Sequence, residues 1–203
     1  MARPARFSDD DILDGAARAV RALGPRVTIA DIAREIGGPS GSIYHRFASR
    51  DELLGHLWVR SIRRFHLGLL AALQIEDPRD AIRRAARHIP EHCRQNPAEA
   101  RAMLLFSQRR LLESGPESLR DEVEHINDDI DTALMRITGA IPALAPERAR
   151  EVLTVATRLA PYGITRPFIG GDVPRWLDDA VAAAAIAIAD SAVGRGESPS
   201  RTG

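Results

Sequence analysis

The sequence lacks several features that define common protein classes. It contains one cysteine, Cys93, which excludes an intrachain disulfide and a cysteine-based zinc finger. Its longest apolar run, residues 180–189, has ten residues and is too short to cross a bilayer, which takes about 20. Acidic residues at positions 9–11 interrupt any N-terminal secretory signal. We therefore expect a soluble, cytoplasmic protein with no membrane partner.

Signatures of enzyme active sites are also missing. The chain has no nucleophile elbow, no phosphate-binding glycine loop and no dinucleotide fingerprint. Its glycine-rich stretch, residues 37–41, has no lysine and follows no predicted strand. The sequence therefore predicts neither an enzyme nor a cofactor.

Charge is balanced overall but not along the chain. All 28 basic residues are arginine, which indicates a GC-rich coding bias, and they equal the 28 acidic residues in number. Residues 1–66 hold 11 arginines and 8 acidic residues, whereas residues 67–203 hold 17 and 20. Attraction to nucleic acid phosphates requires such a positive excess at the binding end, although an ordinary scatter of charges would also produce it.

Hydrophobic spacing predicts an all-α fold. Apolar residues recur at intervals of three and four, and no segment alternates convincingly with a period of two. The main expected helices cover about residues 49–73, 119–137, 146–159 and 175–193, with an irregular stretch at 161–174.

The expected domain organisation has two folded parts. A three-helix domain with a helix-turn-helix, residues 1–50, precedes a larger helical effector and dimerisation domain of about nine helices, residues 51–193. A polar, glycine-rich tail, residues 194–203, is expected to be disordered.

The segment 27–54 has the layout of a helix-turn-helix. Thr28 and Asp31 form a capping box that starts one short helix. Residues 37–39, Gly-Gly-Pro, stop this helix, because glycine accepts the left-handed backbone at a helix end and proline suits the next first turn. The second helix, residues 40–47, turns its apolar side chains inward and leaves small, hydrogen-bonding groups outside.

This segment resembles the TetR family of one-component transcriptional regulators. The usual signature of that family runs Thr-x-x-x-Ile-Ala, an Ala-Gly-Val-Ser turn, Gly-Thr-Leu-Tyr, then an aromatic followed by x-x-Lys and an acid. The matching residues are Thr28, Ile32, Ala33, Gly37, Gly41, Ser42, Ile43, Tyr44, Phe47, Arg50 and Asp51. Gly38-Pro39 replaces the common Val-Ser, and Arg50 stands where lysine is commoner. The arginine keeps the charge, so this exchange is conservative if the contact is simply to a phosphate.

The resemblance implies that the motif binds double-stranded DNA. The residues expected to contact the phosphate backbone are Thr28, Tyr44, His45, Arg46 and Arg50. Ser40, Gly41 and Ser42, at the tip of the second helix, can touch base edges but cannot make the bidentate arginine–guanine contact. Two alternatives stay open: Tyr44 as a core residue, and readout through the N-terminal arm that carries Arg3 and Arg6.

The last helix is apolar all round between residues 179 and 190, which a surface helix does not tolerate. Burial within its own domain is one explanation. Taken with the resemblance, the pattern predicts that this helix and the one before it pack against their copies in a homodimer, so that the operator is a pseudo-palindrome. The expected interface residues are Val152, Leu153, Val155, Ala156, Leu159, Trp176, Leu177, Val181, Ala184 and Ile188.

The resemblance also implies a hydrophobic effector cavity in the larger domain. The expected lining residues are Trp58, Ile62, Phe65, His66, Ile89, His92, Met103 and Phe106; the simpler alternative is that they fill a core. His88 and His92 have the spacing of two metal ligands on one helix face, but Pro90 lies between them and no third ligand is specified nearby. No metal site is expected.

The function predicted by these observations is that of a TetR-like homodimeric DNA-binding regulator, a repressor released from its operator by a small, largely apolar ligand. One alternative is a small-molecule sensing protein whose helical head lacks useful DNA specificity. A helical enzyme using His88 and His92 ranks below both.

Overall fold

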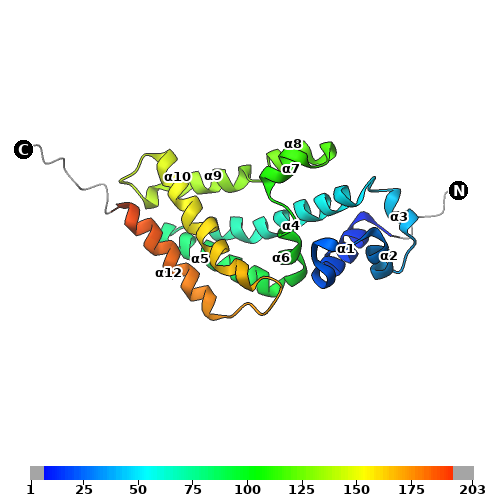
Figure 1. Cartoon of the computed structure of the whole chain (residues 1–203). Helices are drawn as coiled ribbons and strands as arrows, with labels where there is room; N and C mark the ends of the chain where they lie inside the picture. Colours follow the sequence, from blue (N-terminus) through cyan, green and yellow to red (C-terminus); the bar gives the residue numbers. More distant parts are fainter. Residues whose placement is uncertain (1–6, 194–203) are drawn as a thin grey trace, which may run out of the picture. The chain divides into compact units, whose positions relative to one another are not determined.

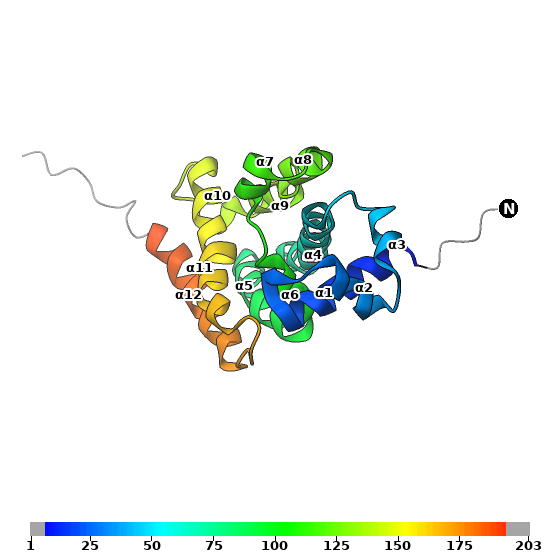
Figure 2. The same cartoon turned by 45° about the vertical axis from the view of Figure 1, so that its right-hand side comes forward.

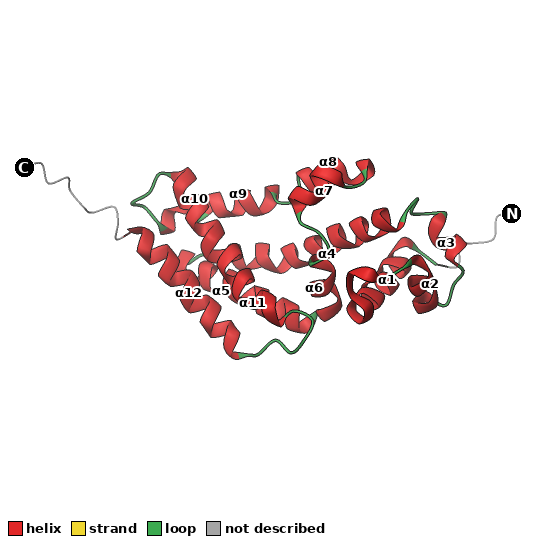
Figure 3. Cartoon of the chain, viewed as in Figure 1, coloured by secondary structure: helices red, strands yellow, loops and turns green. Residues whose placement is uncertain are grey.

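The computed structural model describes residues 7–193, and within that range the chain forms helices joined by loops, without a strand (Figure 3). The predicted all-α class is confirmed. The chain divides into two compact units: unit 1 comprises Met1–Arg64 and Asn96–Ile126, and unit 2 comprises Phe65–Gln95 and Asn127–Gly203. The predicted tail and the arm residues Arg3 and Arg6 lie outside the described residues.

Unit 1 contains the N-terminal helices and a later group of short ones (Figure 1). Its elements are α1 (Asp9–Leu23), the 3-10 turn η1 (Gly24–Arg26), α2 (Ile29–Ile36), α3 (Ser40–Tyr44), the first part of α4 (Arg50–Leu73), α6 (Pro97–Met103), α7 (Gln108–Ser114), the 3-10 turn η2 (Glu117–Leu119) and α8 (Arg120–Glu124).

The first three helices are organised around the apolar face of α1. Ile12 and Val20 of α1, Ile32 of α2 and Ile43 of α3 are fully buried in one cluster. Removing such side chains from water stabilises the fold by about 1.5–3 kcal/mol each. This shared core fixes α2 and α3 against α1.

In unit 2, two long helices that are far apart in the sequence pack against each other. Its elements are the rest of α4, α5 (Pro78–Gln95), α9 (Asp128–Arg136), the 3-10 turn η3 (Thr138–Ala140), α10 (Pro146–Thr154), the π-helical turn η4 (Val155–Leu159), α11 (Ala160–Thr165), the 3-10 turn η5 (Arg166–Phe168) and α12 (Trp176–Val193). Helices α5 and α12 lie side by side (Figures 1 and 2).

Arginine side chains of α5 form ion pairs with acidic residues of α12. Arg79 donates two hydrogen bonds to the Asp190 carboxylate, at 2.6 and 3.0 Å. Arg94 donates to Asp178 at 2.7 Å and to the Val173 carbonyl at 2.9 Å. Such forked contacts are stronger than single hydrogen bonds, so they orient α12 and the loop before it on α5.

The helix expected over residues 119–137 is interrupted. It consists of η2, α8 and α9, and the chain leaves the helical path between α8 and α9. The side-chain amide of Gln108 donates to the carbonyls of Val123 and Glu124, at 2.9 and 3.3 Å. These carbonyls stand at the end of α8, so the amide takes the place of the next helical N–H groups.

The irregular stretch expected at residues 161–174 begins later than predicted. The helical path that starts with α10 continues through the π-helical turn and α11 to Thr165. Pro161 lies near the start of α11, directly after Ala160, whose N–H bonds back to the Val155 carbonyl. Proline is tolerated in the first turn of a helix, and the π-helical turn creates such a start inside a continuous path.

The predicted long helix and the predicted number of later helices agree with the structure. The long helix predicted over about residues 49–73 is α4, and nine α-helices, α4 to α12, follow α3 within the described range. None of the described helices is both long and apolar enough to span a membrane. The boundary predicted at residue 50 concerns function, and it stays a prediction.

Candidate nucleic-acid interface

Helix α2 starts with the predicted capping box. The Thr28 hydroxyl accepts from the Asp31 backbone N–H at 3.2 Å and donates to the Asp31 carboxylate at 2.6 Å. The Thr28 backbone N–H donates to the same carboxylate at 3.0 Å. These bonds lower the pKa of Asp31, because they favour its ionised form. The negative charge at the helix start also suits the helix dipole.

The turn after α2 depends on two glycines. Gly37 has a φ of 64°, the left-handed conformation that glycine adopts without strain. At Gly38, an added Cβ would lie 2.6 Å from a ring carbon of Phe7, so any larger side chain would displace that ring. Pro39 then takes an extended conformation and precedes α3 directly. Gly38, which replaces the common valine, thus leaves space for the Phe7 ring.

Helix α3 turns its polar side outward, as predicted. Ile43 is fully buried. Ser40 and Ser42 are half-buried, Gly41 and His45 are exposed, and Tyr44 is 55% exposed. Tyr44 is therefore not a core residue. The regular helix ends at Tyr44, earlier than the predicted Phe47.

The two predicted phosphate-binding arginines make contacts within unit 1. The Arg46 guanidinium forms an ion pair with Asp9, in the first turn of α1. The Arg50 guanidinium donates to the carbonyls of Val27 and Pro25 and to the carboxylate of the adjacent Asp51. Arg50 therefore lies beside Val27, the residue that precedes the Thr28 cap.

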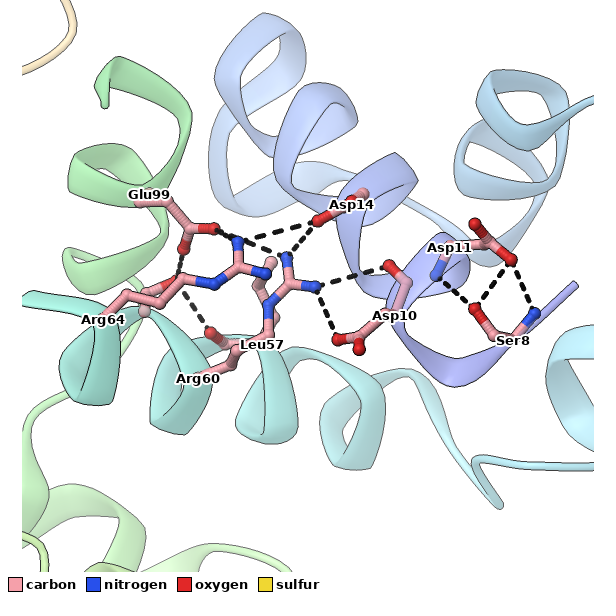
Figure 4. A network of polar contacts seen from close by, with 9 residues as sticks. Ser8, Asp10, Asp11, Asp14, Leu57, Arg60, Arg64 and Glu99 are labelled. Atoms are coloured by element: carbon pink, nitrogen blue, oxygen red, sulfur yellow. Dashed lines mark hydrogen bonds and ion pairs between the residues drawn. The ribbon is translucent and has the colours of Figure 1, made fainter. Parts of the chain in front are cut away.

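An ion-pair network that sequence reasoning missed joins three helices of unit 1 (Figure 4). The Glu99 carboxylate of α6 accepts from Arg64 at 2.5 Å, from Arg60 at 3.5 Å and from the Ser61 hydroxyl. Arg60 also pairs with Asp14 of α1 at 2.9 Å. The partners are more than 35 residues apart in several of these pairs, and no local sequence pattern marks them.

The predicted dimer residues separate by burial. Leu153, Ala156, Leu177 and Val181 are buried within unit 2 and serve its own core. Val152, Ala184 and Ile188 are half-buried, and the exposed ones are Val155, Leu159 and Trp176. The exposed members of this set therefore lie on the π-helical turn and at the start of α12.

The residues expected to line an effector cavity divide between the two units. Those in unit 1 are Trp58, Ile62, Met103 and Phe106, and those in unit 2 are Phe65, His66, Ile89 and His92. Whether they line one cavity stays a prediction. In unit 1, the Trp58 indole N–H donates to the Met103 carbonyl at 3.2 Å.

In unit 2, Phe65 and His88 stack with ring centres 4.9 Å apart. The His88 ring lies against Gly68, where an added Cβ would be 2.2 Å from a ring carbon. Burial lowers the pKa of His88, and burial raises the pKa of the Cys93 thiol, also on α5, to about 12. Within the part of the chain that the structure describes, no three His, Cys, Asp or Glu residues are grouped to hold a metal ion.

A capped helix, a glycine turn and a second helix with a polar outer side define the N-terminal part as a helix-turn-helix domain. Residues 12–57 match the family described as bacterial regulatory proteins, tetR family. No curated protein matches the chain.

Solved structures share the fold along most of the chain. A transcriptional regulator from Rhodococcus sp. Rha1 has a TM-score of 0.73 at 18% identity, and the match covers 92% of this chain and 98% of that one. The TetR family regulator PfmR from Thermus thermophilus has a TM-score of 0.66 at 20% identity, covering 88% and 97%. A ketosteroid transcriptional regulator of Mycobacterium tuberculosis has a TM-score of 0.63 at 17% identity, covering 92% and 95%. The chain thus carries the TetR-family N-terminal domain on the fold of such regulators, and the predicted resemblance is confirmed.

Proposed function

We propose that the protein is a homodimeric transcriptional regulator that binds a pseudo-palindromic DNA operator through α3. The observation that carries this proposal is the outward side of α3, where Tyr44 and His45 are exposed beside the small residues Ser40, Gly41 and Ser42. Short side chains allow the backbone to approach base edges closely, while the tyrosine hydroxyl and the imidazole can donate to phosphates. Specificity then depends on few direct bonds together with DNA shape.

The DNA-binding function is tested by selecting binding sites from random duplexes and measuring affinity over a series of salt concentrations. Tyr44→Phe should weaken binding to operator and random DNA alike, by roughly fivefold, which is the contribution of one hydrogen bond of about 1 kcal/mol. Because Tyr44 is 55% exposed, thermal stability should not change. Tyr162→Phe, in unit 2, is the matched control. A selection that enriches no sequence would favour the alternative of a sensing protein without DNA specificity.

The proposal includes a homodimer formed by unit 2. Exposed Val155, Leu159 and Trp176 supply apolar surface, and α12 has small side chains that let a second helix approach. Two copies related by a twofold axis would present two copies of α3 to two half-sites.

We further propose that a small, largely apolar ligand releases the protein from the operator, so that it acts as a repressor. Support comes from the apolar character of the expected lining residues and from a similar fold in a regulator named for ketosteroids. A ligand can shift DNA binding by no more than its difference in affinity for the two states, and DNA must weaken ligand binding by the same factor.

Compounds would be screened by thermal shift, and those that stabilise the protein would then be tested for loss of operator binding. A compound that stabilises the protein but leaves operator affinity unchanged at saturation binds a site uncoupled from DNA. A set of such compounds alone, with none that releases the operator, contradicts the release mechanism.

A further inference from the structure

Arg50 is bound within unit 1 by a forked set of contacts. Its Nε donates to the Val27 carbonyl at 2.6 Å, one terminal nitrogen donates to the Pro25 carbonyl, and the other donates to the Asp51 carboxylate at 2.8 Å. All three guanidinium nitrogens are therefore engaged. The side chain is 36% exposed, so it lies partly under the surface.

The two carbonyls belong to the segment that leads into α2. Pro25 lies in the 3-10 turn η1, and Val27 is the fully buried residue directly before the Thr28 cap. Arg50 itself is the first residue of α4. A single side chain thus fixes the start of α2 to the start of α4.

Only a planar guanidinium meets this set of acceptors. Its five N–H groups point in fixed directions from three nitrogens, and two neighbouring nitrogens can serve carbonyls two residues apart. A lysine ammonium carries the same charge on a single nitrogen, so it cannot place three separate donor nitrogens at the two carbonyls and the Asp51 carboxylate. The position where lysine is commoner in the family signature therefore holds a residue with a different geometry here.

We propose that Arg50 is a positioning residue, which holds the start of α2 in place for DNA binding, and not a phosphate contact. This inference rests on the proposed DNA-binding function. If Arg50 is a positioning residue, its contribution to DNA affinity comes from the placement of α2. If Arg50 contacts a phosphate, that contribution comes from its positive charge.

The first experiment uses the uncomplexed protein. Amide hydrogen exchange is compared between wild type, Arg50→Lys and the control Arg18→Lys, whose exposed guanidinium pairs with Glu35 in the same domain. The expected result is faster exchange at Val27, Thr28 and Asp31 in Arg50→Lys, by at least fivefold, and no change at these positions in Arg18→Lys. Equal exchange in all three proteins would overturn the proposal.

The second experiment measures DNA affinity against salt concentration. Loss of one phosphate contact reduces the slope of log affinity against log salt by about 0.9. The expected result is an affinity at least fivefold lower for Arg50→Lys and for Arg50→Gln, with the wild-type slope in both. A wild-type affinity for Arg50→Lys, with a slope reduced by about 0.9 for Arg50→Gln, would show a phosphate contact instead.

A third measurement needs no variant and holds if the substitutions prevent folding. The Arg50 Nε–H signal of the wild-type protein is followed by NMR without DNA and with DNA. A slowly exchanging signal that does not shift on binding supports the proposal, and a signal that shifts strongly contradicts it. If the wild-type protein binds no duplex, the proposed DNA-binding function is wrong. The hydrogen exchange of the uncomplexed protein still shows whether Arg50 holds the start of α2 in place.

Discussion

Gly41 is the residue at which fold and function can be separated most directly. It lies within α3, its backbone is exposed, and an added Cβ would meet no atom within 4 Å. Alanine is better than glycine in a helix by up to about 1 kcal/mol. The fold therefore gains from alanine here, whereas the close approach to DNA that we propose at this residue needs glycine.

Gly41→Ala should raise the free energy of unfolding by about 0.5–1 kcal/mol and lower operator affinity by about tenfold. Urea unfolding and fluorescence anisotropy measure the two effects. Gly163→Ala is the control, because Gly163 lies in α11 with equally open space around it. It should leave DNA affinity unchanged. Wild-type operator affinity in Gly41→Ala would show that DNA does not approach this backbone.

We expect His88 to make the stability of unit 2 depend on pH. Burial lowers its pKa, the hydrogen bond with the Phe65 carbonyl opposes this, Arg84 lowers the pKa and Glu91 raises it. The unfolded residue has a pKa of about 6.5, so the unfolded state binds more protons as pH falls below that value. The stabilising contribution of neutral His88 is therefore complete above about pH 6.5 and is lost as pH falls toward the lower folded pKa.

We expect the urea midpoint of the wild type to fall between about pH 7.5 and pH 5.5, and to fall less in His88→Gln. His125→Gln, at a side chain 62% exposed, should keep the wild-type dependence. The same dependence in wild type and His88→Gln would assign the effect to other groups.

At the scale of elements, the Glu99 network joins α1, α4 and α6 within unit 1 (Figure 4). Glu99 and Arg60 have side chains only 10% and 12% exposed. Removing one partner from a buried ion pair leaves the other charge in a medium of low polarity, which costs about 3–5 kcal/mol.

Glu99→Ala should lower the free energy of unfolding by about 3 kcal/mol, because Arg60 keeps its pair with Asp14 and so loses only part of its stabilisation. Chemical denaturation gives the value. Glu113→Ala, which removes an exposed pair with Arg109 in α7, should change it by less than about 0.5 kcal/mol. Similar losses in both variants would mean that the buried network contributes no more than a surface pair.

Elements whose signals are local in sequence were predictable. Spacing alone identifies three such features: the capping box of Thr28, the left-handed backbone at Gly37 and the apolar face of the long helix α4. Each depends on residues within a few helical turns. The outward side of α3 follows from the same periodicity.

What could not be predicted depends on partners distant in sequence. The break between α8 and α9 involves the amide of Gln108, 15 residues before Val123. The contacts of Arg50 end on backbone carbonyls, which every residue has and no sequence pattern marks. Burial of Leu153 and Leu177 within unit 2 required knowledge of which helix covers each face.

At the scale of the whole molecule, the proposed dimer depends on exposed apolar surface of unit 2. Leu159 is 59% exposed, so a charge there should leave the fold of the single chain intact. In a twofold interface the same charge would lie near its own copy in a medium of low polarity, which opposes association.

Leu159→Asp should therefore give monomers in sedimentation at micromolar concentration, with reduced operator affinity and unchanged helix content. Leu67→Asp is the matched control, since Leu67 is 70% exposed on α4 and outside the predicted interface. Dimers of Leu159→Asp as stable as the wild type, or a wild-type protein that is monomeric, would contradict the proposed interface.

Cys93 makes the protein convenient for site-specific labelling. It is the single cysteine of the chain, it is 4% exposed, and its pKa of about 12 leaves almost no thiolate at neutral pH. Maleimide dyes and nitroxide spin labels should therefore not react with the native thiol. A cysteine introduced at exposed Ser49 would be the sole reactive site, and distances between labelled copies could then be followed as compounds are added.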